Sequence, residues 1–150
     1  MTGKHNAAMN SKNARGFTLI ELMIVMVIIA MLAALVGPRL MNALESSKVK
    51  TTKVQIEQLA TTLDGFRLDV GRYPTQQEGL ITLIQNTNPP IPNWRGPYLK
   101  KMTLPNDGWG QPFIYERPGK HKDIDYDLYS LGADGKPGGD GDNSDIGNWQ

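Results

Sequence analysis

The hydrophobic pattern divides the chain into one long apolar segment and a region of mixed character. Leu22 to Val36 is a run of fifteen apolar residues, and the stretch from Phe17 to Gly37 is interrupted only by Thr18 and Glu21. At a rise of about 1.5 Å per residue, a helix from Phe17 to Pro38 would span the roughly 30 Å core of a bilayer. The pattern predicts a transmembrane helix over residues 17–38.

Helical periodicity resumes beyond Pro38, where a proline inside a helix predicts a kink or local melting. One apolar face recurs at the spacing of an α-helix, so residues 39–71 are predicted as an amphipathic stalk that continues a single helix over 17–70. Its members are Ile56, Leu59, Ala60, Leu63, Phe66 and Val70. Residues 45–53 hold only Val49 as an apolar residue, which interrupts any coiled-coil heptad and predicts exposure to solvent or contact with other subunits.

Residues 72–150 change to short apolar pieces punctuated by proline and glycine. A short helix is predicted over 79–84, and strands over 113–117 and 126–130 joined by a polar turn. In the second strand, alternation places Tyr126, Leu128 and Ser130 on one face. The predicted fold is therefore α+β, with the long N-terminal helix packed on a small antiparallel sheet in a globular head.

Charge is balanced only in total, with 16 basic against 15 acidic side chains. Residues 1–16 carry three basic and no acidic residues, whereas 123–150 carry seven Asp and one Lys. Even totals and a pI near 7.9 argue against a nucleic-acid binder. The absence of cysteine excludes disulfides, thiolate zinc sites and cysteine nucleophiles.

Catalytic constellations are missing from the sequence. His5 lies in the basic N-terminal segment and His121 in a polar turn. Neither has a nucleophile or a second acid–base residue beside it in the sequence, so a surface histidine is the simpler interpretation of each. Glycine-rich phosphate signatures are also absent, since the glycines near the C-terminus lie among acids. We therefore predict that the chain is not an enzyme.

Three interpretations compete for the apolar segment: a cleaved secretory signal peptide, a membrane anchor, or a buried helix of a soluble protein. A domain of this size cannot bury so long an apolar helix. Glu21 argues against a discarded signal peptide, because an intramembrane carboxylate costs on the order of 2.5–3.5 kcal/mol on insertion scales and calls for a partner. Lys4, Lys12 and Arg15 place the N-terminus in the cytoplasm by the positive-inside rule.

The string Arg15-Gly16-Phe17-Thr18-Leu19-Ile20-Glu21-Leu22, followed by the apolar run, resembles the class III leader of type IV pilins and type II secretion pseudopilins. This resemblance implies that a prepilin peptidase removes residues 1–16 by cutting after Gly16, and then methylates Phe17. It also implies that Glu21 meets the N-terminal amine of a neighbouring subunit during assembly. The alternative is that Glu21 snorkels to the lipid headgroups.

Residues 71–75, 108–113 and the C-terminal region resemble the major pseudopilins of the type II secretion system in particular. The resemblance implies a ladle-like type IV pilin fold, stored in the bacterial inner membrane as a single-pass protein with a periplasmic head of residues 72–150. It implies assembly into a helical homopolymer, with minor pseudopilins and an inner-membrane platform as partners, that drives export of folded proteins from the periplasm. The region around Gly37 and Pro38 could unwind in such a filament.

An acidic, glycine-rich loop over 130–145 holds four carboxylates, at Asp134, Asp140, Asp142 and Asp145. Oxygen donors without His or Cys suit Ca²⁺, although a solvated tail with no site is the alternative. The loop matches neither an EF-hand nor a nonapeptide calcium repeat.

The resemblance implies a structural Ca²⁺ in this loop, in place of the disulfide that ordinary type IV pilins carry. Its ligands would be the carboxylates of Asp134, Asp142 and Asp145 and the carbonyls of Leu131 and Lys136. Asp140 and Ser144 are further candidates. We also predict that Ile146 and Trp149 dock on the sheet. A minor pseudopilin, a type IV pilin subunit and a non-polymerising, membrane-anchored calcium-binding module remain alternatives.

Overall fold

The computed structural model describes residues 16–121 and 123–150. The predicted leader, apart from Gly16, therefore lies outside the described residues. The chain divides into two compact units whose boundary falls between Leu40 and Met41. Helix α1 (Leu19–Val70) begins in the first unit and ends in the second, as the predicted single helix requires.

Pro38 lies inside α1 without interrupting it. The predicted local melting is therefore not present in this structure. A proline removes one backbone donor from the helix, and the long helical segments on both sides are sufficient to carry the conformation through that position.

The core of the second unit forms where the apolar face of α1 packs on the head. Leu63 and Phe66 are completely buried, and Ile56 and Leu59 are nearly so. They form one core cluster with the strand residues Tyr115, Leu128 and Ile146, with Phe113 and Tyr126 next to those strands, with Leu80 and Leu83 of a 3₁₀ helix, and with Tyr73 and Ile91. The helical periodicity therefore predicted the buried face correctly.

Residues 45–53 are less exposed than their polarity predicts. Thr52 is fully buried, and its hydroxyl accepts a hydrogen bond from the backbone N–H of Gly108 at 2.9 Å. Glu45 accepts a bond from the indole of Trp109 at 3.0 Å. The turn around Gly108 thus packs on this part of α1, because a polar helix face can be buried when its side chains supply hydrogen-bond partners.

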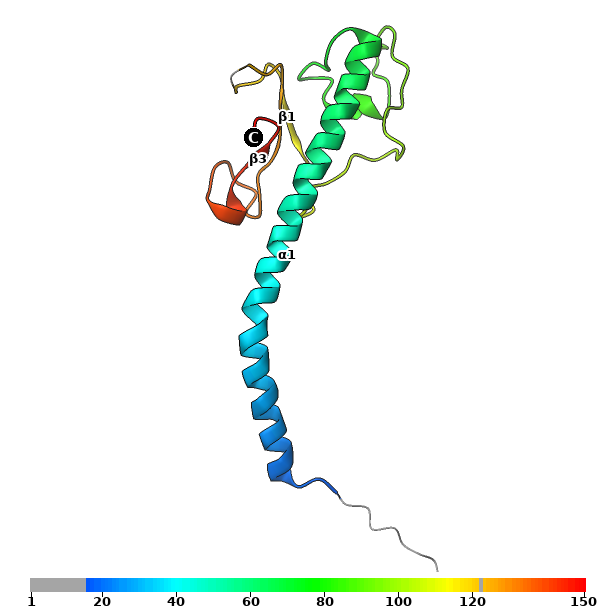
Figure 1. Ribbon diagram of the computed structural model, residues 1–150. Coiled ribbons are helices and arrows are strands. Elements are labelled where there is room, and N and C mark those ends of the chain that lie inside the picture. Colours follow the sequence, from blue (N-terminus) through cyan, green and yellow to red (C-terminus); the bar gives the residue numbers. More distant parts are fainter. Residues whose placement is uncertain (1–15, 122) are drawn as a thin grey trace, which may run out of the picture. The chain divides into compact units, whose positions relative to one another are not determined.

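A three-stranded antiparallel sheet lies beside the second half of α1 (Figure 1). The strands are β1 (Ile114–Glu116), β2 (Asp127–Ser130) and β3 (Ile146–Gly147), in spatial order β1-β2-β3. Tyr115 pairs with Leu128, and Ser130 pairs with Ile146. Two 3₁₀ helices complete the elements, η1 (Leu80–Leu83) and η2 (Gly141–Asn143).

The alternation predicted for β2 is present, with Leu128 and Ser130 at zero exposure and Tyr126 nearly buried. Asp127, on the opposite face, is also buried. Its carboxylate accepts the backbone N–H of Lys120 at 2.8 Å, because the β1–β2 turn folds over it. Strand β3 was not predicted, since two residues carry no detectable periodicity.

Candidate assembly and metal-binding sites

The start of α1 is closed by a capping box between Thr18 and Glu21. The hydroxyl of Thr18 accepts the backbone N–H of Glu21 at 3.2 Å, and Glu21 Oε2 accepts the backbone N–H of Thr18 at 2.9 Å. The Thr18 hydroxyl also donates to Glu21 Oε2 at 3.0 Å. These bonds satisfy backbone donors that a helix start leaves unpaired. The sequence T-L-I-E carries this signal, which our sequence analysis did not use.

Glu21 therefore has a local structural role in addition to the predicted pairing with a neighbouring subunit. Both side-chain hydrogen bonds it makes to Thr18 use Oε2. Within the described residues no hydrogen bond to Oε1 is found, and the Glu21 side chain is exposed. Gly16 and Phe17, the predicted cleavage and methylation residues, precede the cap outside the helix and are exposed.

The apolar surface of the first unit is unusually exposed. Phe17 is 91% exposed, and the large apolar side chains that follow it are each about half exposed or more. An 18-residue window of α1 is apolar enough to cross a membrane, and none of it is buried. So much unpartnered apolar surface needs lipid or other helices around it.

The acidic loop turns tightly between β2 and β3. Asp134 Oδ1 accepts the N–H of Lys136 at 3.1 Å, and the carbonyl of Asp142 accepts the N–H of Ala133 at 2.9 Å. Asp145 Oδ2 accepts the N–H of Gly138 at 3.0 Å. Gly138 has a φ of 88°, which a residue with a side chain adopts only with strain.

These contacts bring the two arms of the loop together but do not assemble a carboxylate cluster. Among residues 16–121 and 123–150, no three Asp, Glu or His side chains are placed to hold one ion. Asp134, Asp140 and Asp142 are exposed, and Leu131 and Ser144 are half-buried. A cation in this loop would therefore need main-chain carbonyls beside its carboxylates.

One atom of the loop does fit a cation. Asp145 Oδ1 is shielded from solvent and has no hydrogen-bond partner among the described residues. A buried carboxylate oxygen without a partner is costly, and a hard cation would satisfy it. The donor chemistry of the loop, all oxygen, suits the same ion.

The acidic loop is joined to the core at the end of β2. Buried Ser130 donates to buried Asp107 Oδ2 at 2.5 Å and accepts the N–H of Gly132 at 3.1 Å. Asp107 Oδ1 in turn accepts the N–H groups of Trp109 and Gln111. This network holds the first residues of the loop against the turn that packs on α1.

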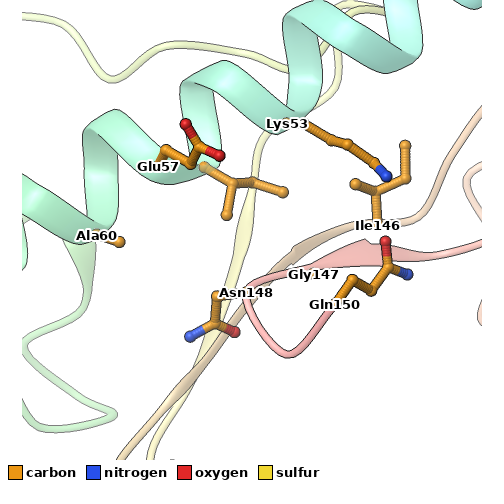
Figure 2. A pocket seen from close by; sticks show the side chains of 8 residues that line it. Lys53, Glu57, Ala60, Ile146, Gly147, Asn148 and Gln150 are labelled. Atoms are coloured by element: carbon orange, nitrogen blue, oxygen red, sulfur yellow. The ribbon is translucent and has the colours of Figure 1, made fainter.

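The C-terminal segment docks on the head, as predicted for Ile146 and Trp149. Ile146 is buried in the core, and β3 extends the sheet. A cavity of about 190 Å³ separates this segment from α1, with Lys53, Glu57 and Ala60 on the helix side and Gly147 and Gln150 on the other (Figure 2).

His121 is the principal residue that sequence reasoning missed. Its ring stacks on the indole of Trp149, with centroids 3.7 Å apart and planes at 11°. Its Nδ1 lies 3.1 Å from Asp127 Oδ2. The sequence separates these three residues and carries no periodic signal that would have joined them.

Comparisons with known proteins agree with this architecture. Residues 39–149 match the family model described as type II secretion system protein G, and residues 11–37 match the prokaryotic N-terminal methylation motif. The chain is 46% identical to the type II secretion system core protein G of Pseudomonas aeruginosa, over 94% of this chain and 99% of that protein. It is 43% identical to the core protein G of Vibrio cholerae, over 89% and 90%.

A solved structure gives the same result. The crystal structure of the major pseudopilin from the type 2 secretion system of enterohaemorrhagic Escherichia coli matches with a TM-score of 0.60 and 34% identity. The match covers 75% of this chain and 95% of that one.

A methylation motif, an exposed apolar helix and a small antiparallel head define a pilin-like structural subunit. Within that class the chain belongs to the protein G family of the type II secretion system, the major pseudopilins. The resemblance on which the sequence analysis relied is thereby confirmed, and the apolar helix agrees with membrane anchoring.

Proposed function

We propose that this chain is the structural subunit from which the type II secretion pseudopilus is built, and that its work is polymerisation. The observation that carries the proposal is the exposed apolar helix. Its first turn contains Glu21, which takes part in the capping box and lies five residues after Gly16. Family membership supports it independently.

In this proposal prepilin peptidase cuts after Gly16 and methylates Phe17. The helix is retained, so the processed subunit stays in the inner membrane as a single-pass protein. The three basic residues of the leader favour a cytoplasmic N-terminus before processing, and the head then lies in the periplasm. The methylation motif over residues 11–37 supports this processing.

In this proposal, assembly is driven by pairing of two opposite charges that lie in the apolar membrane environment. Cleavage creates an ammonium group on Phe17, and Glu21 Oε1 is free of the cap to accept it from a neighbouring subunit. Opposite charges attract far more strongly in low dielectric than in water, and a misplaced subunit would leave both unpaired. The helices then stack into a helical homopolymer, with minor pseudopilins and the inner-membrane platform as further partners.

We further propose that the acidic loop holds a structural Ca²⁺. The carboxylates of Asp134, Asp142 and Asp145 and the carbonyls of Leu131 and Lys136 are the proposed ligands, with Asp140 and Ser144 as additional donors. The unpartnered Asp145 Oδ1 supports the site. The ion would neutralise part of the negative charge of the loop and fix its two arms.

N-terminal analysis of the membrane-extracted protein tests the proposal. A chain that begins with methylated Phe17, and that is recovered in sheared fibres, is the expected result. An intact Met1 would overturn the processing, and a processed chain that never enters fibres would favour a membrane-anchored module that does not polymerise. Fibre stoichiometry separates a major from a minor subunit.

A further inference from the structure

Gln76 bonds to the outer edge of β1 with its side-chain amide. Its Nε2 donates to the backbone carbonyl of Tyr115 at 3.1 Å, and its Oε1 accepts the backbone N–H of Arg117 at 2.7 Å. A peptide group of a neighbouring strand also offers one donor and one acceptor. The amide therefore satisfies backbone groups of β1 that a further strand would need for pairing.

The segment that carries Gln76 is fixed beside β1 by two further contacts. The buried hydroxyl of Tyr115 donates to the carbonyl of Pro74 at 2.7 Å, and the guanidinium of Arg117 donates to the carbonyl of Tyr73. Both contacts come from the same stretch of chain whose backbone the amide covers. Although Gln76 is exposed to solvent, the fold thus places its amide at the edge of the strand.

Two other positions of the sheet are covered by amide side chains as well. Asn148 bonds to the carbonyl of Tyr126 and to the N–H of Leu128, where β3 ends. Gln150 Nε2 donates to the carbonyl of Asp145 at 2.9 Å, directly before β3. Since β3 has only two residues and β1 has three, the edge that Gln76 covers is the longer of the two outer edges.

Other features of β1 would favour pairing with a second copy of the chain. Ile114 and Tyr115 belong to residue types that are common in strands. Charged side chains often prevent pairing at an edge, but Glu116 lies 2.9 Å from the ammonium of Lys120, so this pair is close to neutral. The amide of Gln76 is then the group that an added strand would have to displace.

We propose that Gln76 determines which surface the subunits use for assembly: by occupying the outer edge of β1, it keeps a second copy of this chain from pairing with the sheet. Assembly is then left to other surfaces, α1 among them. The inference rests on the proposed function for the assembly that it protects. The closed edge itself is a property of the head and can be tested without fibres.

Sedimentation velocity of the full chain in an excess of detergent micelles tests the proposal. Gln76→Ala removes both edge bonds. We expect its dissociation constant for self-association to lie about tenfold or more below that of the parent, which corresponds to roughly one or two net hydrogen bonds. Gln77→Ala is the matched control, because Gln77 is also exposed and takes no part in the edge bonds, and it should behave like the parent.

Amide hydrogen exchange measured by NMR identifies the surface that pairs. In the parent, the Arg117 N–H should exchange slowly at every protein concentration, because Gln76 Oε1 accepts it. In Gln76→Ala it should exchange about tenfold faster in dilute samples and slow down as the concentration rises, because a second copy then supplies the acceptor. A general loss of stability would instead speed the exchange of amides throughout the head at all concentrations.

Gln76→Asn is a second variant, which keeps the amide but is one methylene too short to reach both backbone groups, and it should associate in the same way. Two results would overturn the proposal: Gln76→Ala remains as monomeric as Gln77→Ala, or it associates while the Arg117 N–H keeps its fast exchange. A parent chain that never enters fibres would contradict the proposed function, but it would leave this comparison in micelles unchanged.

Discussion

Ser130 donates a hydrogen bond to Asp107 at 2.5 Å, and both side chains are buried. Ser130 ends β2 and Asp107 lies in the turn that packs on α1, so a single bond connects the sheet, the helix and the acidic loop. Neither residue stands out in the sequence, and together they hold the start of the acidic loop by hydrogen bonds.

Replacing Ser130 with Ala should destabilise the head. Asp107 Oδ2 would lose its donor and the N–H of Gly132 its acceptor, at a cost of about 1–3 kcal/mol. Denaturant unfolding of the full chain in detergent measures the change. Ser46→Ala, on an exposed position of α1, is the matched control and should be neutral. Equal stabilities of the two variants would show that the buried bond contributes little.

Calcium should protect the acidic loop from proteolysis, because the ion would tie its two arms together. Asp134→Ala and Asp145→Ala should remain protease-sensitive at calcium concentrations that protect the parent. Asp123→Asn removes an equal charge from an exposed position outside the loop and should leave the protection intact. If both loop variants are protected like the parent, these carboxylates are not ligands.

Glu21→Gln should separate the two roles of this residue. Glutamine can replace glutamate in a capping box, so the helix start should persist, whereas the negative charge is lost. We expect normal cleavage after Gly16 and a strong loss of sheared fibres, measured by immunoblotting of membrane and fibre fractions.

Thr18→Val is the complementary variant, since it removes the capping hydroxyl at a cost of about 1 kcal/mol and keeps the charge. It should assemble better than Glu21→Gln. Loss of fibres in Thr18→Val alone would assign the role of Glu21 to capping.

Acid should lower the stability of the head by protonating Glu78. Arg72 binds both of its carboxylate oxygens, at 2.6 and 2.7 Å, and lowers its pKa from 4.5 to about 2, although burial opposes this. A lowered pKa adds stability above about pH 4.5 that is lost as the pH falls toward 2.

Comparison of the parent with Glu78→Gln at several pH values isolates this contribution. The parent should be more stable by about 1 kcal/mol at neutral pH, a modest value because Arg72 is partly exposed to solvent. The difference should shrink below pH 4.5. A difference that does not depend on pH would mean that the ion pair contributes nothing beyond its hydrogen bonds.

Gly108→Ala should loosen the contact between its turn and α1. An added Cβ would collide with the backbone carbonyl of Lys48, which cannot move without deforming the helix. Overpacking of this kind costs about 1–3 kcal/mol. A melting curve measures this loss of stability. Gly110→Ala is unsuitable as a control because Gly110 has a positive φ. Gly65→Ala is suitable because its added Cβ would make only an ordinary van der Waals contact.

The elements with long hydrophobic patterns were predictable from the sequence. The helix over 17–70 and its buried face follow from apolar spacing sustained over many turns. The two predicted strands were placed within one residue at each end, because alternation and turn residues agree there.

Features built from contacts between distant residues were not predictable in the same way. The bond between Thr52 and Gly108, the stack of His121 on Trp149 and the bond between Ser130 and Asp107 join residues 56, 28 and 23 positions apart. Each depends on a tertiary approach that local patterns do not encode. The capping box at Thr18 is different, since its signal was local and was overlooked.

Beyond the end of β3, the side chain of Asn148 makes the hydrogen bonds to the neighbouring backbone that a longer strand would make. Its Oδ1 accepts the N–H of Leu128 at 2.9 Å and its Nδ2 donates to the carbonyl of Tyr126 at 3.1 Å, while its own N–H bonds to Leu128. Because β3 is only two residues long, it leaves backbone groups of Leu128 and Tyr126 without a strand partner, and the Asn148 amide bonds to them instead. Another strand therefore cannot pair with this part of β2 beyond the end of β3. Any strand added to the sheet would have to pair with the outer edge of β1 or of β3.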